Sequence, residues 1–284
     1  MNKVKIVVDS TVDLNKDMYE ALDMHVVPLQ VRFDDETFDD GVNITQEELY
    51  ARVEKDGKLP ATAAISPDKL KAEIETFINQ GMDVVFVGIG SKLSSTVQNV
   101  NIAAQELPEG RVFVIDSESL SSGSGLLAMK CAKLRDEGKS AKEICETVQA
   151  LTPKVSTKFV LDRFDFMHKG GRCSAMVKMF GHLFHIHPVL KIVEGKLIVE
   201  SKPRGPIRVA YQVMLDELKA DLETGVDMDN IMITHAGMKD DDLAYLKSKV
   251  SELVNPNVIR VTKAGCVISS HCGFGTVGIL YIKK

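Results

Sequence analysis

Short apolar runs alternate with helix-like segments through the first half of the chain. Residues 4–8, 84–89 and 111–116 are runs of strand length rich in valine and isoleucine, which is typical of strands buried on both faces. The spacing of apolar residues predicts helices over residues 15–22 and 66–79, between such runs. This alternation predicts a mostly parallel sheet with helices on both of its faces.

Capping signals place further elements in this half. Residues 45–48 read Thr-Gln-Glu-Glu, a capping box that predicts a helix ending at Gly57. Residues 140–143 form a second capping box, which predicts another helix. We also predict one continuous strand over residues 25–33, because apolar and polar positions alternate there.

The second half of the chain predicts a different, strand-rich α/β unit. Strands are expected at residues 155–161, 189–193, 196–199, 231–236, 258–261, 267–270 and 279–282, and helices at 174–185, 207–222 and after Met238. We therefore predict an α/β protein with two domains, residues 1–158 and residues 159–284. No low-complexity linker lies between them, so the domains are expected to pack closely.

Composition and charge exclude several classes of protein. Hydrophobic residues make up 44% and charged residues 26% of the chain, close to the soluble globular average. The net charge of −5, without a block of Lys and Arg, argues against a nucleic-acid binder. No apolar run reaches about 18 residues, so transient membrane contact, but no membrane span, fits the sequence. The absence of a visible signal peptide and the five widely spaced Cys residues lead us to expect a cytoplasmic protein with reduced thiols.

Clusters of hydroxyl and carboxyl side chains follow three of the predicted strands, at residues 9–11, 91–96 and 116–121. Carboxyl ends of parallel strands meet at one edge of a sheet, and helix N-termini there offer free N–H groups, so this edge predicts a site for an anionic ligand. The alternative is that these residues only cap the following helices. Capping explains the adjacent Ser94 and Ser95 less well, because one helix start needs one cap.

Nucleotide and metal motifs are weak in this sequence. No Walker A motif is present, and residues 273–278 match G-x-G-x-x-G too near Lys284 for the crossover helix of a dinucleotide fold. We interpret these glycines as sites of tight turns or close backbone approach. His182, His185 and His187 have no acidic or Cys partner at zinc spacing, so we predict no metal and no cofactor.

Candidate ligand contacts also occur in the second half. Residues 159–167 and 176–184 are rich in Met and Phe, and they predict either ordinary core or a long apolar pocket. His271 is expected at a strand end, either as a site residue or as a hydrogen-bonded core histidine. Arg172 and Arg204 lie in glycine-containing turns, which suits contact with a carboxylate, a phosphate or a protein partner; a plain surface arginine is the alternative.

These residues, in this order, resemble the DegV family, the bacterial fatty-acid-binding proteins that serve as subunits of fatty acid kinase. The matching pieces span nearly the whole chain. They are residues 8–14, 27–29, 40–41, Thr62, 91–96, 116–117, 169–172, 204–205 and 269–271. Thr62 is followed here by Ala-Ala-Ile-Ser, where the family usually has Ser-Gln-Pro-Ser.

The resemblance implies a two-domain DegV-like fold that holds one long-chain fatty acid as its ligand. By matching positions, Thr62, Ser94 and His271 would bind the carboxylate. Ser95, Arg172 and Arg204 would make secondary contacts with the ligand or with the partner. That partner would be a separate catalytic kinase subunit that uses ATP to form an acyl phosphate for phospholipid synthesis. The chain itself would be a carrier without catalysis of its own.

Two other functions remain open on the sequence. The first is a serine-dependent acyl hydrolase or transferase, with Ser94 or Ser95 as nucleophile and His271 as base. The nucleophile-elbow pattern G-x-S-x-G is missing around Ser94, which argues against it. The second is a binding module for a phosphorylated metabolite, which would need basic residues in the strand-end loops, where only Lys92 is found.

Overall fold

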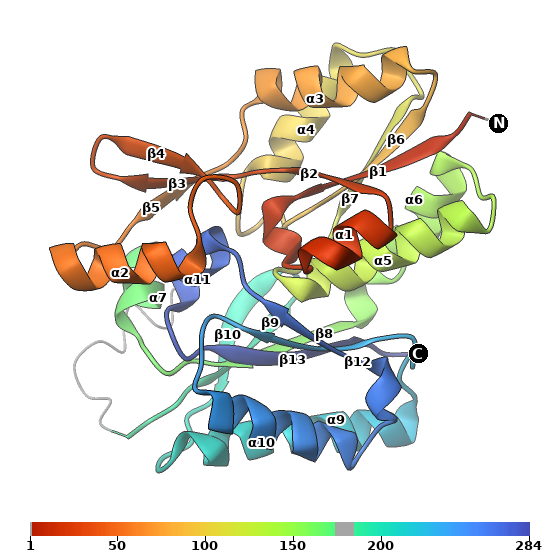
Figure 1. Ribbon diagram of the computed structural model, residues 1–284. Helices are drawn as coiled ribbons and strands as arrows, with labels where there is room; N and C mark the ends of the chain where they lie inside the picture. Colours follow the sequence, from red (N-terminus) through yellow and green to blue (C-terminus); the bar gives the residue numbers. More distant parts are fainter. Residues whose placement is uncertain (1, 174–184) are drawn as a thin grey trace.

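The computed structural model describes residues 2–173 and 185–284 and confirms the α/β fold (Figure 1). Its first sheet has the strand order β2-β1-β6-β7, and every pair in it is parallel, as predicted. The strands of this sheet are β1 (Val4–Asp9), β2 (Met24–Val27), β6 (Asp83–Gly88) and β7 (Val112–Asp116).

Helices cover both faces of this sheet because consecutive strand residues, which point to opposite faces, are both apolar. Val7 and Phe86 face a core shared with α3 and α4, whereas Val8 and Val85 face a core shared with α5 and α6. The helices of this half are α1 (Lys16–Ala21), α2 (Gln46–Asp56), α3 (Pro67–Asn79), α4 (Thr96–Gln105), α5 (Ser122–Asp136) and α6 (Ala141–Gln149). Both predicted capping boxes are present, at the starts of α2 and α6.

The predicted single strand over residues 25–33 is wrong. The chain leaves the first sheet after β2, and β3 (Gln30–Phe33) instead joins a small antiparallel sheet with β4 (Glu36–Asp39) and β5 (Ala61–Ala63). Pro28 has no N–H for a sheet ladder. The N–H of Leu29 donates to the hydroxyl of Ser10 instead of to a strand, so the backbone turns at this point.

The second half forms a mixed sheet with the order β10-β9-β8-β13-β11-β12. Its strands are β8 (Val155–Val160), β9 (Val189–Val193), β10 (Lys196–Ser201), β11 (Ile231–His235), β12 (Ile259–Lys263) and β13 (Val277–Ile282). One face packs against α9 (Ile207–Thr224) and α10 (Asp240–Ser251). On the other face, Met232 and Leu280 share a core with α5, which therefore lies between the two sheets (Figure 1).

The predicted strand over residues 267–270 is also wrong, because this segment forms the helix α11 (Cys266–Cys272). A short apolar run fits a buried helix as well as a buried strand, and periodicity does not separate them. The helix ends before Gly273, whose φ of 78° favours glycine. Although α11 comes late in the chain, it packs against β3, β5, η1 (Ser10–Val12), α2 and α7 (Asp165–Gly170).

Two short 3₁₀ helices and three expectations from the sequence remain to be placed. The short 3₁₀ helices η2 (Thr152–Lys154) and η3 (Pro256–Val258) complete the described chain. The helix expected over residues 174–185 lies almost entirely outside the described residues, and the division into domains 1–158 and 159–284 stays a prediction. Across the described part of the chain, no helix combines the length and hydrophobicity needed to cross a membrane.

Candidate functional site

The polar loops that follow β1, β6 and β7 lie side by side, because these strands are neighbours in one parallel sheet. Many of their polar side chains form hydrogen bonds within the loops themselves. Asp9 accepts hydrogen bonds from the N–H groups of Thr11 (2.9 Å) and Ile89 (2.8 Å), so capping and loop closure account for this carboxylate. Ser94 and Ser95, which follow β6, differ because they border an open cavity.

This cavity lies between the two halves of the chain and has a volume of about 240 Å³. Its polar lining residues are Thr62, Ser94, Ser95, Arg172 and His271. Its apolar lining comes from Leu29, Ala63, Ala64, Ile89, Leu93, Leu120, Met167, Leu197, Val267, Ile268 and Cys272. Ser95 and Arg172 are exposed and therefore lie at the opening. The cavity combines one polar end with a wall that is otherwise apolar.

Thr62 and His271 form a direct pair at the polar end. Thr62 lies in β5, where it pairs with Val31 of β3, and His271 lies in the last turn of α11. The Thr62 Oγ1 atom is 2.8 Å from His271 Nε2. Residues 209 positions apart in the sequence therefore share one hydrogen bond.

The surroundings of His271 keep its ring neutral. Burial, together with the smaller effect of the positive charge of Arg172, lowers its pKa from 6.5 to about 4. His271 Nδ1 is buried and has no hydrogen-bond partner among the residues that the structure describes. A Cβ atom added at Gly170 would collide with this nitrogen, so the close approach of α7 to the ring requires glycine there.

Ser94 lies at the start of α4, half-buried at the cavity wall. Its Oγ atom accepts a hydrogen bond from the N–H of Thr96 (3.3 Å) and lies 3.0 Å from Thr96 Oγ1. Ser94 therefore satisfies the helix start, as the capping alternative requires, and its hydroxyl also borders the cavity. Ser95 takes the N-cap position but makes no side-chain cap bond.

The two predicted arginines lie in different places. The Arg172 guanidinium donates to the carbonyl of Gly170 (2.7 Å) and reaches that of Leu93 (3.4 Å). It supplies positive charge beside His271. Arg204 lies on an exposed loop before α9 and does not line the cavity. The structure thus brings together Thr62, Ser94, Ser95, Arg172 and His271, and leaves Arg204 outside the cavity.

Comparison with known proteins agrees with this fold. The model of the DegV family, a family of uncharacterised proteins, matches residues 3–284. The chain belongs to the DegV family. A DegV domain-containing protein of Clostridium acetobutylicum is 30% identical to it over 284 residues, which cover 100% of both chains.

Two solved DegV structures are similar to the chain over its full length. One describes fatty acid binding by a DegV family protein from Thermus thermophilus, with 30% identity, a TM-score of 0.90 and 100% of both chains covered. The other is DegV from Bacillus subtilis, described as a fatty acid binding protein, with 25% identity, a TM-score of 0.87 and 100% of both chains covered.

The apolar wall of the cavity in this DegV chain was only partly predictable. Met167 lines the cavity, but Phe166 packs instead into the N-terminal core beside Tyr50. Phe159 borders a smaller cavity of about 20 Å³ that shares Leu120 and Ile268 with the main one. Residues 176–184 lie outside the described residues.

Other wall residues were missed. Leu29, Leu120 and Leu197 come from three distant segments. Leu29 lies in a piece that resembles the DegV family, whereas the only sequence signal of Leu120 and Leu197 is that they are apolar. Of the histidines considered for a metal, His182 lies outside the described residues and His187 lies 3.4 Å from Asp162. Residues 2–173 and 185–284 contain no group of three or more metal-ligating side chains.

Proposed function

We propose that this protein binds one long-chain fatty acid in the cavity, with the carboxylate toward Thr62, Ser94 and His271. The observation that carries the proposal is the pairing of Thr62 with His271 at the polar end of a mostly apolar cavity. The descriptions of the Thermus thermophilus and Bacillus subtilis relatives, which name fatty acid binding, support it.

The buried side of His271 suggests how the carboxylate is recognised. A buried N–H without an acceptor is rarer than a buried acceptor without a donor. Since Nδ1 is the nitrogen without a described partner, the proton belongs on Nε2, which then donates to Thr62 Oγ1. The hydroxyl hydrogen of Thr62 is left free to donate to a carboxylate in the cavity. Ser94 supplies a second hydroxyl, and Arg172 supplies positive charge at the opening.

The apolar wall and the polar end have different roles in this account. Burying one methylene group contributes about 0.8 kcal/mol, so roughly fifteen contribute on the order of 10 kcal/mol before ordering costs. A hydrogen bond to a charged group contributes about 1.5–3 kcal/mol. The acyl chain therefore sets most of the affinity, whereas Thr62 and Ser94 set the direction and depth of binding.

The carrier role extends this proposal. We infer that the chain works in the cytoplasm and has no catalysis of its own. It presents the carboxylate to a separate kinase subunit, which uses ATP to make an acyl phosphate for phospholipid synthesis. The open polar end of the cavity supports this division of labour, because Ser95 and Arg172 leave the carboxylate near solvent. Arg204, exposed outside the cavity, is proposed as a contact for that subunit.

The geometry favours binding over hydrolysis. A serine nucleophile needs a histidine within hydrogen-bond reach, and that histidine needs an orienting partner. His271 Nε2 instead contacts Thr62. Its Nδ1 atom meets no carboxylate in the described part of the chain. Turnover of a p-nitrophenyl acyl ester that disappears in Ser94→Ala would favour the hydrolase.

A double variant tests the carboxylate site. We expect Thr62→Val with Ser94→Ala to weaken fatty acid binding about tenfold to a hundredfold per hydroxyl, because each lost hydrogen bond to a charged group costs about 1.5–3 kcal/mol. Titration with a fluorescent fatty acid measures the affinity, and acyl phosphate output with the kinase subunit should fall sharply.

The matched control is Thr76→Val with Ser251→Ala, which removes the same groups from exposed helix positions. It should bind the fatty acid like the wild type. Unchanged affinity and unchanged acyl phosphate output in the Thr62 and Ser94 variant would contradict the proposed carboxylate site.

A further inference from the structure

The helix α11 belongs to the second half of the chain, but carboxylates from the first half hold its start. The N–H of Gly265 donates to Asp13 Oδ1 (2.7 Å), and the N–H of Cys266 donates to Asp40 Oδ1 (2.6 Å). Both carboxylates are buried, with 2% and 3% of their surface exposed. These donors would otherwise be unpaired N–H groups at a helix start.

The second oxygen of each carboxylate is also held. Asp13 Oδ2 accepts a hydrogen bond from the Ser121 hydroxyl (2.5 Å), and Asp40 Oδ2 accepts one from the Ser10 hydroxyl (2.9 Å). Asp13 and Ser121 both have positive φ angles, 49° and 55°. Such strain persists in non-glycine residues only where the surroundings fix the conformation. Asp13 is therefore anchored to α5 while it holds α11.

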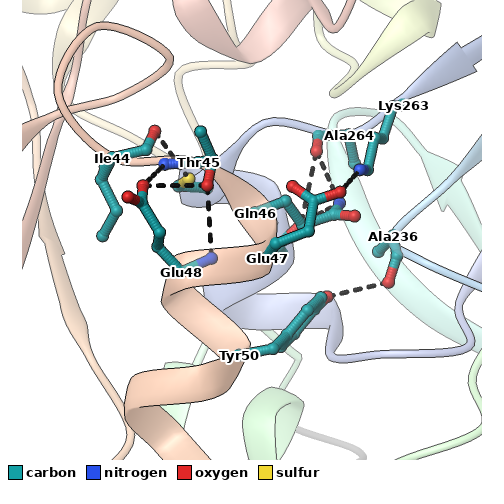
Figure 2. Close-up of polar contacts among 11 residues, drawn as sticks. Ile44, Thr45, Gln46, Glu47, Glu48, Tyr50, Ala236, Lys263 and Ala264 are labelled. Carbon is teal, nitrogen blue, oxygen red and sulfur yellow. Dashed lines mark hydrogen bonds and ion pairs between the residues drawn. The ribbon is translucent and has the colours of Figure 1, made fainter.

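The helix α2 holds another side of α11 (Figure 2). The buried Gln46 side chain donates to the carbonyl of Ala264 (2.7 Å) and to the hydroxyl of Ser269 (2.8 Å). The Tyr50 hydroxyl donates to the carbonyl of Ala236 (2.9 Å), at the end of β11. Elements of the first half thus fix α11 both at its start and along its side.

Fixing the start of α11 matters for its other end, which carries His271. A helix of 7 residues is about 10 Å long. A tilt of about 10° at its start would move its end by about 1.7 Å at that length. Such a movement would break the 2.8 Å contact between His271 and Thr62, because Thr62 is held separately in β5.

We propose that Asp13 and Asp40 are positioning residues for His271: their carboxylates fix α11 on the first half of the chain and so keep the imidazole against Thr62. The effect on fatty acid affinity rests on the proposed function. The effect on the His271 ring does not, so the two are measured separately.

Burial disfavours the charged form of Asp13 and Asp40, so their hydrogen bonds to α11 must offset this penalty. Burial raises the pKa of both carboxyls, and the hydrogen bonds from the N–H groups and from Ser10 and Ser121 oppose that rise. Replacing either carboxylate by an apolar group would leave a buried N–H without an acceptor, which is unfavourable. Each buried carboxylate therefore supplies an acceptor that holds the start of α11 in place.

Two variants remove this support in different ways. Asp40→Ala deletes the acceptor for the Cys266 N–H. Gly265→Ala removes no charge, but its added Cβ would lie 3.0 Å from both Asp40 oxygens and 3.3 Å from Asp13 Oδ1, so these carboxylates would have to move by a few tenths of an ångström. Asp40→Asn keeps one acceptor oxygen and serves as the conservative rescue. If Asp40→Ala does not fold, Gly265→Ala carries the test.

The matched control is Asp221→Ala. Asp221 accepts a hydrogen bond from the Tyr281 hydroxyl (2.7 Å) and pairs with Lys283 (2.8 Å). It lies on α9, away from α11. This variant should lower the stability of the protein and leave the His271 ring unchanged.

The first readout is the ¹⁵N NMR shifts of the His271 ring, assigned with His271→Gln, and the second is a titration with cis-parinaric acid. We expect Asp40→Ala and Gly265→Ala to shift both ring nitrogens and to weaken binding at least tenfold, and Asp40→Asn to restore most of both. Unchanged ring shifts in folded Asp40→Ala and Gly265→Ala would overturn the inference. Shifted rings with unchanged affinity would support the positioning role and overturn the proposed role of His271 in fatty acid binding.

Discussion

His271 depends on two residues that lie far from it in the sequence. Thr62 Oγ1 is the hydrogen-bond partner of His271 Nε2, and Gly170 leaves room for the ring beside Nδ1. Only the family resemblance indicated, from the sequence, that Thr62 and His271 belong to the same site. The sequence did not show why the first glycine of the Gly170–Gly171 pair is needed, because the close approach of α7 to α11 is a tertiary contact.

The charge state of His271 predicts how stability depends on pH. The pKa of His271 in the folded protein, about 4, lies below the ordinary value of 6.5. Between these two pH values, His271 therefore binds a proton in the unfolded chain and not in the folded protein. Stability from this group is therefore complete above about pH 6.5 and is lost as the pH falls toward 4.

We expect His271 to account for about 2 kcal/mol of the loss in unfolding free energy between pH 7 and pH 5. Urea denaturation at both pH values measures it, with His271→Gln as the comparison. If the variant shows the same pH dependence as the wild type, His271 is not a buried, neutral histidine in the folded protein.

At the scale of elements, local signals predicted most helices and strands, and tertiary contacts decided the exceptions. The capping boxes of α2 and α6 are encoded within four residues, and both are present. The helix α11 was predicted as a strand because its apolar run is too short to show a period. Its actual surroundings, α2, α7 and the small sheet β4-β3-β5, come from distant parts of the chain.

The contact between α2 and β11 gives a prediction at this scale. We expect Tyr50→Phe to lower the free energy of unfolding by about 1 kcal/mol, because the Ala236 carbonyl loses the hydroxyl that donates to it (Figure 2). Denaturant unfolding measures the change. Tyr245→Phe is the control, since that ring stacks with Arg208 and its hydroxyl makes no hydrogen bond within the described residues. Equal stability of the two variants would show that the Tyr50 contact contributes nothing.

At the scale of the molecule, the cavity arises where two sheets and α11 meet. The sequence predicted an α/β chain with a parallel first sheet, and the fold confirms it. The order β8-β13-β11 in the second sheet pairs the last strand with two earlier ones, and no local pattern encodes such pairing. For the same reason, the apolar wall of the cavity, drawn from both halves, could not be assembled from the sequence.

The exposed position of Arg204 predicts a separation between binding and kinase coupling. We expect Arg204→Ala to bind a fatty acid with wild-type affinity, because this side chain does not line the cavity. Acyl phosphate formation with the kinase subunit should fall, since a bidentate donor would be lost from the contact surface. The measurement is the kinase-dependent rate at saturating fatty acid. An unchanged rate would remove Arg204 from the proposed contact.

The most direct test is solvent extraction of the purified protein followed by mass spectrometry. The account predicts about one long-chain fatty acid per chain, present in the wild type and reduced when Thr62 and Ser94 are both replaced. A wild-type protein that carries no fatty acid, and takes up none when one is supplied, would contradict it.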